Sequence, residues 1–369
     1  MLERELGIGV SNYISSFCHS VFRIEPFESC PLSCLYCYGR WYWRGSAGVR
    51  AIAIRAFEKA AKLLAHVEAP LIPFRLATLS EPLALREGVR LTAKVLRIAL
   101  RCRVPVILNT KTAAFCEPQV KDLVVKAGSS GLLLLQVSVP FLRRETAKVL
   151  EPLATDPESR LRAIERVSSD VPVAVRVQPL IPGVNDSLEE LKELLDEVRS
   201  ARAKHIIAES VRLTPLEARA LEGALGVNLR FSQWERYSFT GGDVRRPPLS
   251  WRVKVMAGLR RLAARSGLTF GTCKEGLLFL HDSRDCCGFR YLEEAGYRLT
   301  LYELWVKGRF DPQVLGEACE EECELLCGER LVKYPRFYRR VLIKHERRLF
   351  KVVSNKDILS ILIQNRAPH

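Results

Sequence analysis

Short apolar runs alternate with amphipathic segments from about residue 20 to residue 214. The runs lie at 22–27, 74–80, 104–111, 132–139, 171–182 and 205–213, and the segments at 51–67, 88–101, 118–127, 157–168 and 187–200. Strands that alternate with helices of this length form βα units around a parallel sheet. The chain is therefore expected to be an α/β protein, either an open partial barrel of six βα units or a doubly wound sheet.

The phasing of the apolar runs favours the barrel. Valines of the fifth run alternate with Arg176, the fourth run carries Gln136 and Ser138 on one face, and Asn109 and Lys111 share a face in the third. A sheet sandwiched between helices should be apolar on both faces. A barrel that holds a polar ligand at its carboxyl-terminal mouth should instead have one face that becomes polar towards that end, as observed here.

The pattern changes after the sixth run, where three of the five tryptophans and six of the twelve cysteines follow. We expect a helix over 250–266, then a cysteine-bearing segment and a basic tail. The chain is thus divided into an N-terminal segment (1–20), the barrel (21–214) and a C-terminal cysteine-containing extension (215–369).

Composition restricts the cellular setting. No stretch reaches the length of a membrane span, and the start, MLERELGIGV, carries acidic residues and no apolar signal core. A cytoplasmic location is therefore expected, and in a reducing compartment clustered cysteines bind metal or perform chemistry more often than they form disulfides. Scarce Asn, Gln and Met beside abundant Arg, Glu and Lys fit a thermophile.

The net charge of +15 indicates an anionic partner, with nucleic acid as the first candidate. An excess spread thinly over the surface would serve only solubility. The tail at 330–351 mixes cations, which suit phosphates, with aromatic rings, which stack on unpaired bases. An amphipathic helix with a solvated charged face has the same composition, so both interpretations stay open.

Three cysteines follow the first run closely, in Cys30-Pro-Leu-Ser-Cys34-Leu-Tyr-Cys37. Thiolates are soft ligands that select iron–sulfur clusters, zinc or copper. Three cysteines cannot close a tetrahedral zinc site alone, and the nearest histidine, His19, stands eleven residues before the first of them. A three-cysteine iron–sulfur cluster leaves one iron without a protein ligand and therefore open to a small molecule.

This CxxxCxxC motif, with an aromatic before its last cysteine and a place just after the first strand of a βα repeat, resembles the signature of the radical S-adenosylmethionine (SAM) superfamily. Thr110-Lys111-Thr112 and the segment from Leu150-Glu-Pro to Asn185-Asp186 resemble its spore-photoproduct-lyase-like group. The resemblance covers roughly residues 20–214. It implies a partial (βα)6 TIM-like barrel with a [4Fe–4S] cluster held by Cys30, Cys34 and Cys37, and SAM at the open iron.

The resemblance also implies roles around SAM. Glu81 matches the position that holds the amino group, Arg176 the position that binds the carboxylate, and Ser138 could bond the ribose or the methionine, with Lys111 lining the same cavity. One electron, from a reductant such as ferredoxin or flavodoxin, would cleave SAM to a 5′-deoxyadenosyl radical that takes a hydrogen from the substrate. No catalytic hydrogen-donor cysteine can be assigned, since a small buried hydrophobe explains Cys116 equally well.

A second cysteine set lies in the extension. Cys273, Cys286 and Cys287 come first, and Cys319, Cys323 and Cys327 follow at helical spacing beside acidic residues. The leading hypothesis is an auxiliary [4Fe–4S] cluster on Cys273, Cys286, Cys287 and one later cysteine, Cys327. Zinc and reduced structural cysteines are the alternatives.

The expected function is radical SAM modification of a nucleic acid, with RNA ahead of DNA. A radical SAM enzyme that modifies a peptide or protein is the first alternative, which the acidic stretch 317–324 favours. A non-catalytic iron–sulfur sensor or electron carrier is the second alternative. Inward-facing Glu81, Ser138 and Arg176 argue against it, because a carrier needs no SAM pocket.

Overall fold

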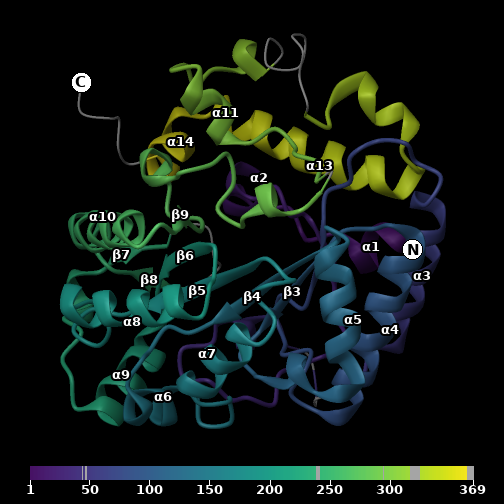
Figure 1. The fold of residues 1–369 in the computed structure, drawn as a ribbon. Coiled ribbons are helices and arrows are strands. Elements are labelled where there is room, and N and C mark those ends of the chain that lie inside the picture. Colours follow the sequence, from purple (N-terminus) through teal and green to yellow (C-terminus); the bar gives the residue numbers. More distant parts are fainter. Residues whose placement is uncertain (44, 46–47, 238–241, 294, 316–324, 364–369) are drawn as a thin grey trace.

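The computed structural model describes residues 1–369 except 44, 46–47, 238–241, 294, 316–324 and 364–369. Seven parallel strands form one sheet in the order β1-β2-β3-β4-β5-β6-β9 (Figure 1). They are β1 (Phe22–Ile24), β2 (Phe74–Leu76), β3 (Val106–Thr110), β4 (Leu133–Ser138), β5 (Val173–Leu180), β6 (His205–Ser210) and β9 (Thr269–Thr272). The expected α/β partial barrel is confirmed.

The six strands expected from the sequence are all present, and each pairs in parallel with the next. The seventh strand, β9, was not expected; it pairs with β6 and comes from the segment assigned to the extension. Its four residues include Gly271, and glycine is disfavoured inside strands, so the sequence does not mark this segment as one. The division of the chain at residue 214 stays a prediction.

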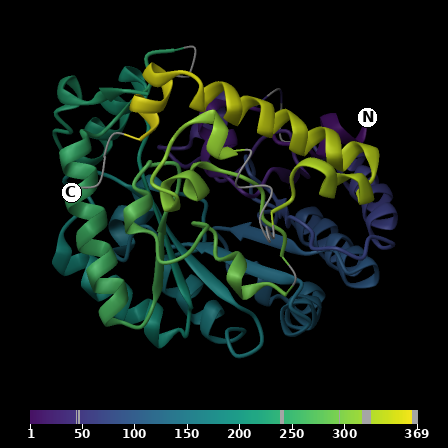
Figure 2. The same cartoon turned by 90° about the horizontal axis from the view of Figure 1, so that it is seen from above.

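Helices connect the strands and cover the outside of the sheet, as Figure 2 shows from above. The connecting helices are α3 (Ala51–Leu64), α4 (Arg86–Cys102), α5 (Pro118–Ser129), α6 (Arg144–Leu150), α7 (Pro157–Glu165), α8 (Leu188–Ser200), α9 (Pro215–Leu225) and α10 (Leu249–Arg265). Their starts follow local rules: Asp156 and Ser187 cap α7 and α8, and Thr214 with Glu217 forms a capping box on α9. A minor antiparallel pair, β7 (Glu235–Arg236) and β8 (Arg245–Arg246), precedes α10.

The two ends of the chain pack together. Helices α1 (Leu2–Leu6) and α2 (Asn12–Phe17) lie against α13 (Arg336–Val353), with α11 (Leu301–Val306) and α14 (Lys356–Leu362) nearby (Figure 1). Ser15 Oγ lies 2.9 Å from His345 Nδ1, joining α2 to α13. No helix in the described part of the chain combines the length and hydropathy needed to cross a bilayer.

The basic tail forms an amphipathic helix with a buried face. In α13 the Tyr338 ring stacks on Phe22, at a centroid distance of 4.3 Å, and the Tyr338 hydroxyl accepts the Ile72 amide at 2.7 Å. Phe22 begins β1 and Ile72 precedes β2, so α13 packs at the amino-terminal end of these strands. Its charged face is therefore carried at the end of the sheet opposite to the strands' carboxyl ends.

Candidate active site

A cavity opens at the carboxyl ends of the strands. Seven residues proposed from the cysteine motif, the strand phases and the family resemblance all line it, namely Cys30, Cys34, Cys37, Glu81, Lys111, Ser138 and Arg176. Parallel strands end at one edge of a barrel, which is why segments far apart in sequence meet there. The structure thus places these residues together, while their individual roles stay predictions.

The three motif cysteines lie on the loop after β1. Ser33 adopts a left-handed conformation with φ of 52°, and the Leu35 amide donates to the Leu150 carbonyl at 2.9 Å, which anchors the loop to the end of α6. Burial raises the pKa of Cys30 and of Cys34 to about 12. Without a bound cation these thiols are therefore protonated, and a metal group must displace their protons to bind.

The donor set fits an iron–sulfur cluster better than a single ion. No histidine lines the cavity. Across the described residues, no three His, Cys, Asp or Glu side chains are placed to hold one metal ion, and that includes Cys30, Cys34 and Cys37. A cubane binds each thiolate at a different iron and therefore suits sulfurs that do not converge on one point.

Glu81 is a buried carboxylate at the cavity wall. It accepts hydrogen bonds from Thr110 Oγ1 at 2.7 Å, the Lys111 amide at 2.7 Å and the Leu83 amide at 3.1 Å. Burial raises its pKa to about 6 despite these donors. A cationic ligand group would therefore gain from pairing with it, as the predicted amino-group role requires.

The loop that carries Glu81 is held by Glu25, which sequence reasoning missed. One oxygen of Glu25 accepts from the Thr78 amide and hydroxyl, both at 2.9 Å, and from the Leu79 amide at 3.1 Å. The other accepts from the Ser80 hydroxyl. The sequence shows only an acidic residue just after the first strand. It does not show the role of Glu25, because the partners of that side chain lie more than fifty residues downstream.

Lys111 belongs to a buried ionic cluster centred on Glu151. Its Nζ lies 2.9 Å from one Glu151 oxygen, and Arg160 donates to the other at 2.5 Å. The Tyr36 hydroxyl, from the cysteine loop, also donates to Glu151. Burial alone would raise the pKa of Glu151, but Lys111 and Arg160 lower it to about 2. The cluster fixes the cysteine loop to β3 and α7.

Ser138 and Arg176 are register partners on β4 and β5. Arg176 donates to Gln136 Oε1 at 2.9 Å. Further along β5, Gln178 lines the cavity with both amide atoms buried and without a hydrogen-bond partner among the described residues. A buried amide rarely stays unpaired, so both Gln178 amide atoms are available to a ligand in the cavity.

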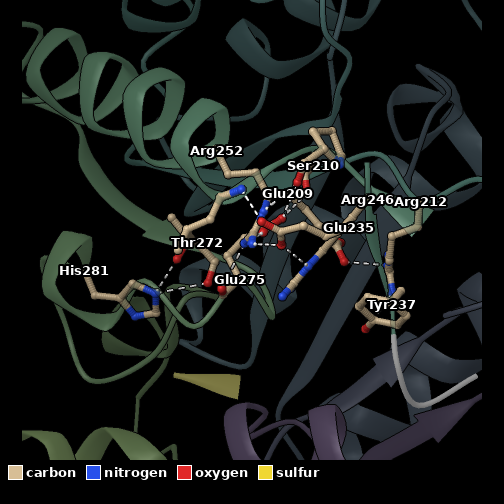
Figure 3. Close-up of polar contacts among 12 residues, drawn as sticks. Glu209, Ser210, Arg212, Glu235, Tyr237, Arg246, Arg252, Thr272, Glu275 and His281 are labelled. Atoms are coloured by element: carbon tan, nitrogen blue, oxygen red, sulfur yellow. Dashed lines mark hydrogen bonds and ion pairs between the residues drawn. The ribbon is translucent and has the colours of Figure 1, made fainter. Parts of the chain in front are cut away.

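A buried polar network supports the wall contributed by β6 (Figure 3). Glu275 accepts from the Ser210 amide at 2.7 Å and hydroxyl at 2.6 Å, and from Arg252 at 2.9 Å. Arg252 also donates to Glu235 at 3.0 Å. Next to it, Arg212 pairs with Glu209 at 2.5 Å, and both line the cavity.

The second cysteine set is divided by the structure. Cys273, Cys286 and Cys287 lie together, buried, away from the cavity lining. Cys327 packs in a separate apolar cluster and is disulfide-bonded. Cys319 and Cys323 lie outside the described residues, as does the acidic stretch 317–324. Cys116 does not line the cavity either, and its thiol donates to the Ala163 carbonyl at 3.3 Å.

No family model matches this chain, and no curated protein matches it in sequence. Solved structures do match. A spore photoproduct lyase with a dinucleoside spore photoproduct has a TM-score of 0.54 at 16% identity, over 71% of this chain and 79% of that one.

Two further matches are more distant. SuiB from Streptococcus suis, bound to S-adenosylmethionine, has a TM-score of 0.45 at 13% identity, over 70% of this chain and 51% of that one. Methylornithine synthase (PylB) has a TM-score of 0.42 at 14% identity, over 84% of this chain and 92% of that one. The match with the spore photoproduct lyase shows that the two chains share a fold, and the α/β partial barrel described above is therefore the fold of that enzyme as well.

Proposed function

We propose that this chain is a radical SAM enzyme. The observation that carries the proposal is that Cys30, Cys34 and Cys37 share one cavity with Glu81 and Arg176, at the carboxyl end of a radical SAM barrel. A non-catalytic iron–sulfur carrier would not need a carboxylate and a guanidinium in the same cavity as the three thiols.

Different residues of the cavity would bind the cluster and the separate groups of SAM. Cys30, Cys34 and Cys37 would hold a [4Fe–4S] cluster, while Glu81 pairs with the amino group of SAM and Arg176 with its carboxylate. Ser138 bonds the ribose or the methionine, and Lys111 keeps the cysteine loop in place through Glu151. When bound, the cluster and SAM supply the one-electron chemistry that yields a 5′-deoxyadenosyl radical. The protein orients the reacting groups and excludes water.

Nucleic acid is the proposed substrate class, RNA ahead of DNA. A net charge of +15 supports it. The structural relative with a TM-score of 0.54 was solved with a dinucleoside photoproduct, which is a nucleic-acid lesion. The charged face of α13 does not contribute at the cavity, because that helix packs at the opposite end of the strands. A cytoplasmic location and a ferredoxin or flavodoxin as reductant belong to the same proposal, and so does a second iron–sulfur cluster.

The test is 5′-deoxyadenosine formation by anaerobically reconstituted, dithionite-reduced protein in a small-molecule-depleted cell extract, intact or nuclease-treated. The triple variant C30A/C34A/C37A is the blank. Formation that falls after nuclease treatment supports a nucleic-acid substrate. Formation that survives nuclease but falls after protease assigns a peptide or protein instead. No formation in either extract, with the cluster assembled and SAM bound, would overturn the enzyme proposal.

A further inference from the structure

We propose that Cys18, Cys273, Cys286 and Cys287 form a second iron–sulfur site, of the four-cysteine [4Fe–4S] type, inside the barrel. Three of these cysteines were expected from the sequence to share a site, and the structure supplies the fourth from the other end of the chain. The inference does not depend on SAM cleavage, since it concerns only what these thiols bind.

The four cysteines meet at the seam of the open sheet. Cys18 leads into β1 and Cys273 follows β9, the two edge strands. The Cys286 thiol lies 3.8 Å from the Cys287 thiol. His19, the residue after Cys18, lies against the same loop, with Nε2 3.3 Å from the Arg284 carbonyl oxygen and its ring 6.3 Å from that of Phe289.

The loop that presents the adjacent cysteines is built to do so. Asp285 Oδ1 accepts the amides of Cys287 and Gly288, both at 2.7 Å, and of Phe289 at 3.1 Å. Gly288 has φ of +87°, a conformation that favours glycine. Asp285 and Gly288 therefore fix a tight turn at Cys286 and Cys287.

Three strands hold the loop against the barrel. His205 Nε2, on β6, lies 3.0 Å from the Cys286 carbonyl oxygen, and Gln136 on β4 donates to the Cys287 carbonyl at 2.8 Å. A Cβ at Gly271 on β9 would lie 2.7 Å from the Cys286 Cα, so glycine is needed for this close approach. The thiols are therefore positioned by fixed contacts on three sides.

The buried side chain of Arg75 has no carboxylate partner among the described residues, which indicates that this site binds a negatively charged group. Arg75 is 8% exposed and donates to the Cys287 sulfur at 3.1 Å. Its other contacts are neutral amides, Asn109 at 2.9 Å and Gln136 at 2.8 Å. No Asp or Glu forms a salt bridge with Arg75 among the described residues. Buried charges need opposite charge, and a cluster with four thiolates provides it.

The identity of the bound group follows from the donors. Four thiols with no histidine or carboxylate ligand favour iron–sulfur chemistry. Four cysteines also form structural zinc sites, so the test below measures sulfide as well as metal. Cys327, the ligand expected from the sequence, is already in a disulfide and lies in another apolar cluster.

The experiment measures iron and acid-labile sulfide in anaerobically reconstituted full-length protein, without SAM. The wild type should hold about eight irons and C30A/C34A/C37A about four. Adding Cys18→Ala to the triple variant should abolish the remaining cluster or reduce it to a three-iron form with a different electron paramagnetic resonance spectrum. Adding Cys116→Ala or Cys327→Ala instead should leave about four irons.

Several results would overturn the proposal: no iron in the triple variant, zinc without sulfide, or loss of iron with Cys327→Ala but not with Cys18→Ala. If the triple variant does not fold, the wild type alone decides. About four irons per chain instead of about eight would then also overturn the proposal. Retention of the second cluster without any 5′-deoxyadenosine formation by the wild type would instead count against the proposed function alone.

Discussion

Two buried carboxyls near the barrel mouth have pKa values shifted in opposite directions. Glu81 has only neutral donors around it, and burial raises its pKa to about 6. Burial acts on Glu151 in the same sense, but Lys111 and Arg160 outweigh it and lower its pKa to about 2. The first carboxyl is suited to receive a cation from a ligand, whereas the second already has its cations and serves to position the cysteine loop.

Glu81 gives a pH prediction. Its raised pKa means that it is protonated below about pH 6, so SAM affinity should fall as the pH is lowered through about 6. Glu81→Gln should bind SAM at least tenfold more weakly at pH 8, because a loss of about 1.4 kcal/mol is tenfold, and should lack this pH step. Calorimetric titration with SAM measures both. A step of equal size in the variant would exclude Glu81 as its source.

Arg160 gives a stability prediction. Arg160→Met leaves Glu151 buried with only one of its two cationic partners and should cost about 3–5 kcal/mol in the free energy of unfolding at pH 7. The folded-state pKa of Glu151 lies below its ordinary value of 4.5, so the contribution is present above pH 4.5 and is lost as the pH falls towards about 2. The difference in the free energy of unfolding between the wild type and the variant should therefore become smaller at low pH. Urea unfolding measures it.

The control for that measurement is on the same helix. Arg162 pairs with Glu158 at 2.5 Å, but both side chains are more than half exposed. Arg162→Met should change the free energy of unfolding by less than about 1 kcal/mol. Equal losses in the two variants would show that helix α7, rather than the buried ion pair, is responsible.

At the scale of elements, the periodic segments were predictable and the short ones were not. The six strands and five of the six α-helices between residues 20 and 214 follow from alternation, while the seven-residue helix α6 was not expected. Strand phase correctly placed Lys111, Ser138 and Arg176 on the cavity side. β9 was missed because it contains Gly271, which is disfavoured in strands, and lies in a segment whose cysteines indicated a metal-binding extension. Cys18 was missed because its neighbours are more than 250 residues away, and no local pattern reports such a contact.

Helix α13 offers a test at this scale. Tyr338→Phe removes the acceptor of the buried Ile72 amide and should cost about 1–3 kcal/mol in the free energy of unfolding. Phe350→Ala, at a side chain that is 52% exposed on the same helix, should cost less than about 0.5 kcal/mol. Thermal or urea unfolding of the two variants and the wild type measures these free-energy differences. A negligible loss in Tyr338→Phe would mean that the helix docks without this hydrogen bond.

For the whole molecule, excess positive charge predicts how a nucleic acid should bind. Affinity for a single-stranded oligonucleotide should fall linearly on a log–log plot against salt, by at least about tenfold between 50 and 200 mM, as counterion release requires. Fluorescence anisotropy with matched RNA and DNA strands measures the slope and the preference. Affinity that is independent of salt, or absent at low salt, would contradict electrostatic binding and favour the peptide or protein alternative.

The packing of α1 and α2 against α13 sets an order on biosynthesis. The first helices leave the ribosome before any strand, yet their partner, α13, is made only after the entire barrel. Domains generally fold from the amino terminus as they emerge, but here the opening residues, including Ser15, must wait for His345 before they can be packed. The packing of α1 and α2 is therefore completed only after α13 has been synthesised, when all seven strands of the sheet have already been made.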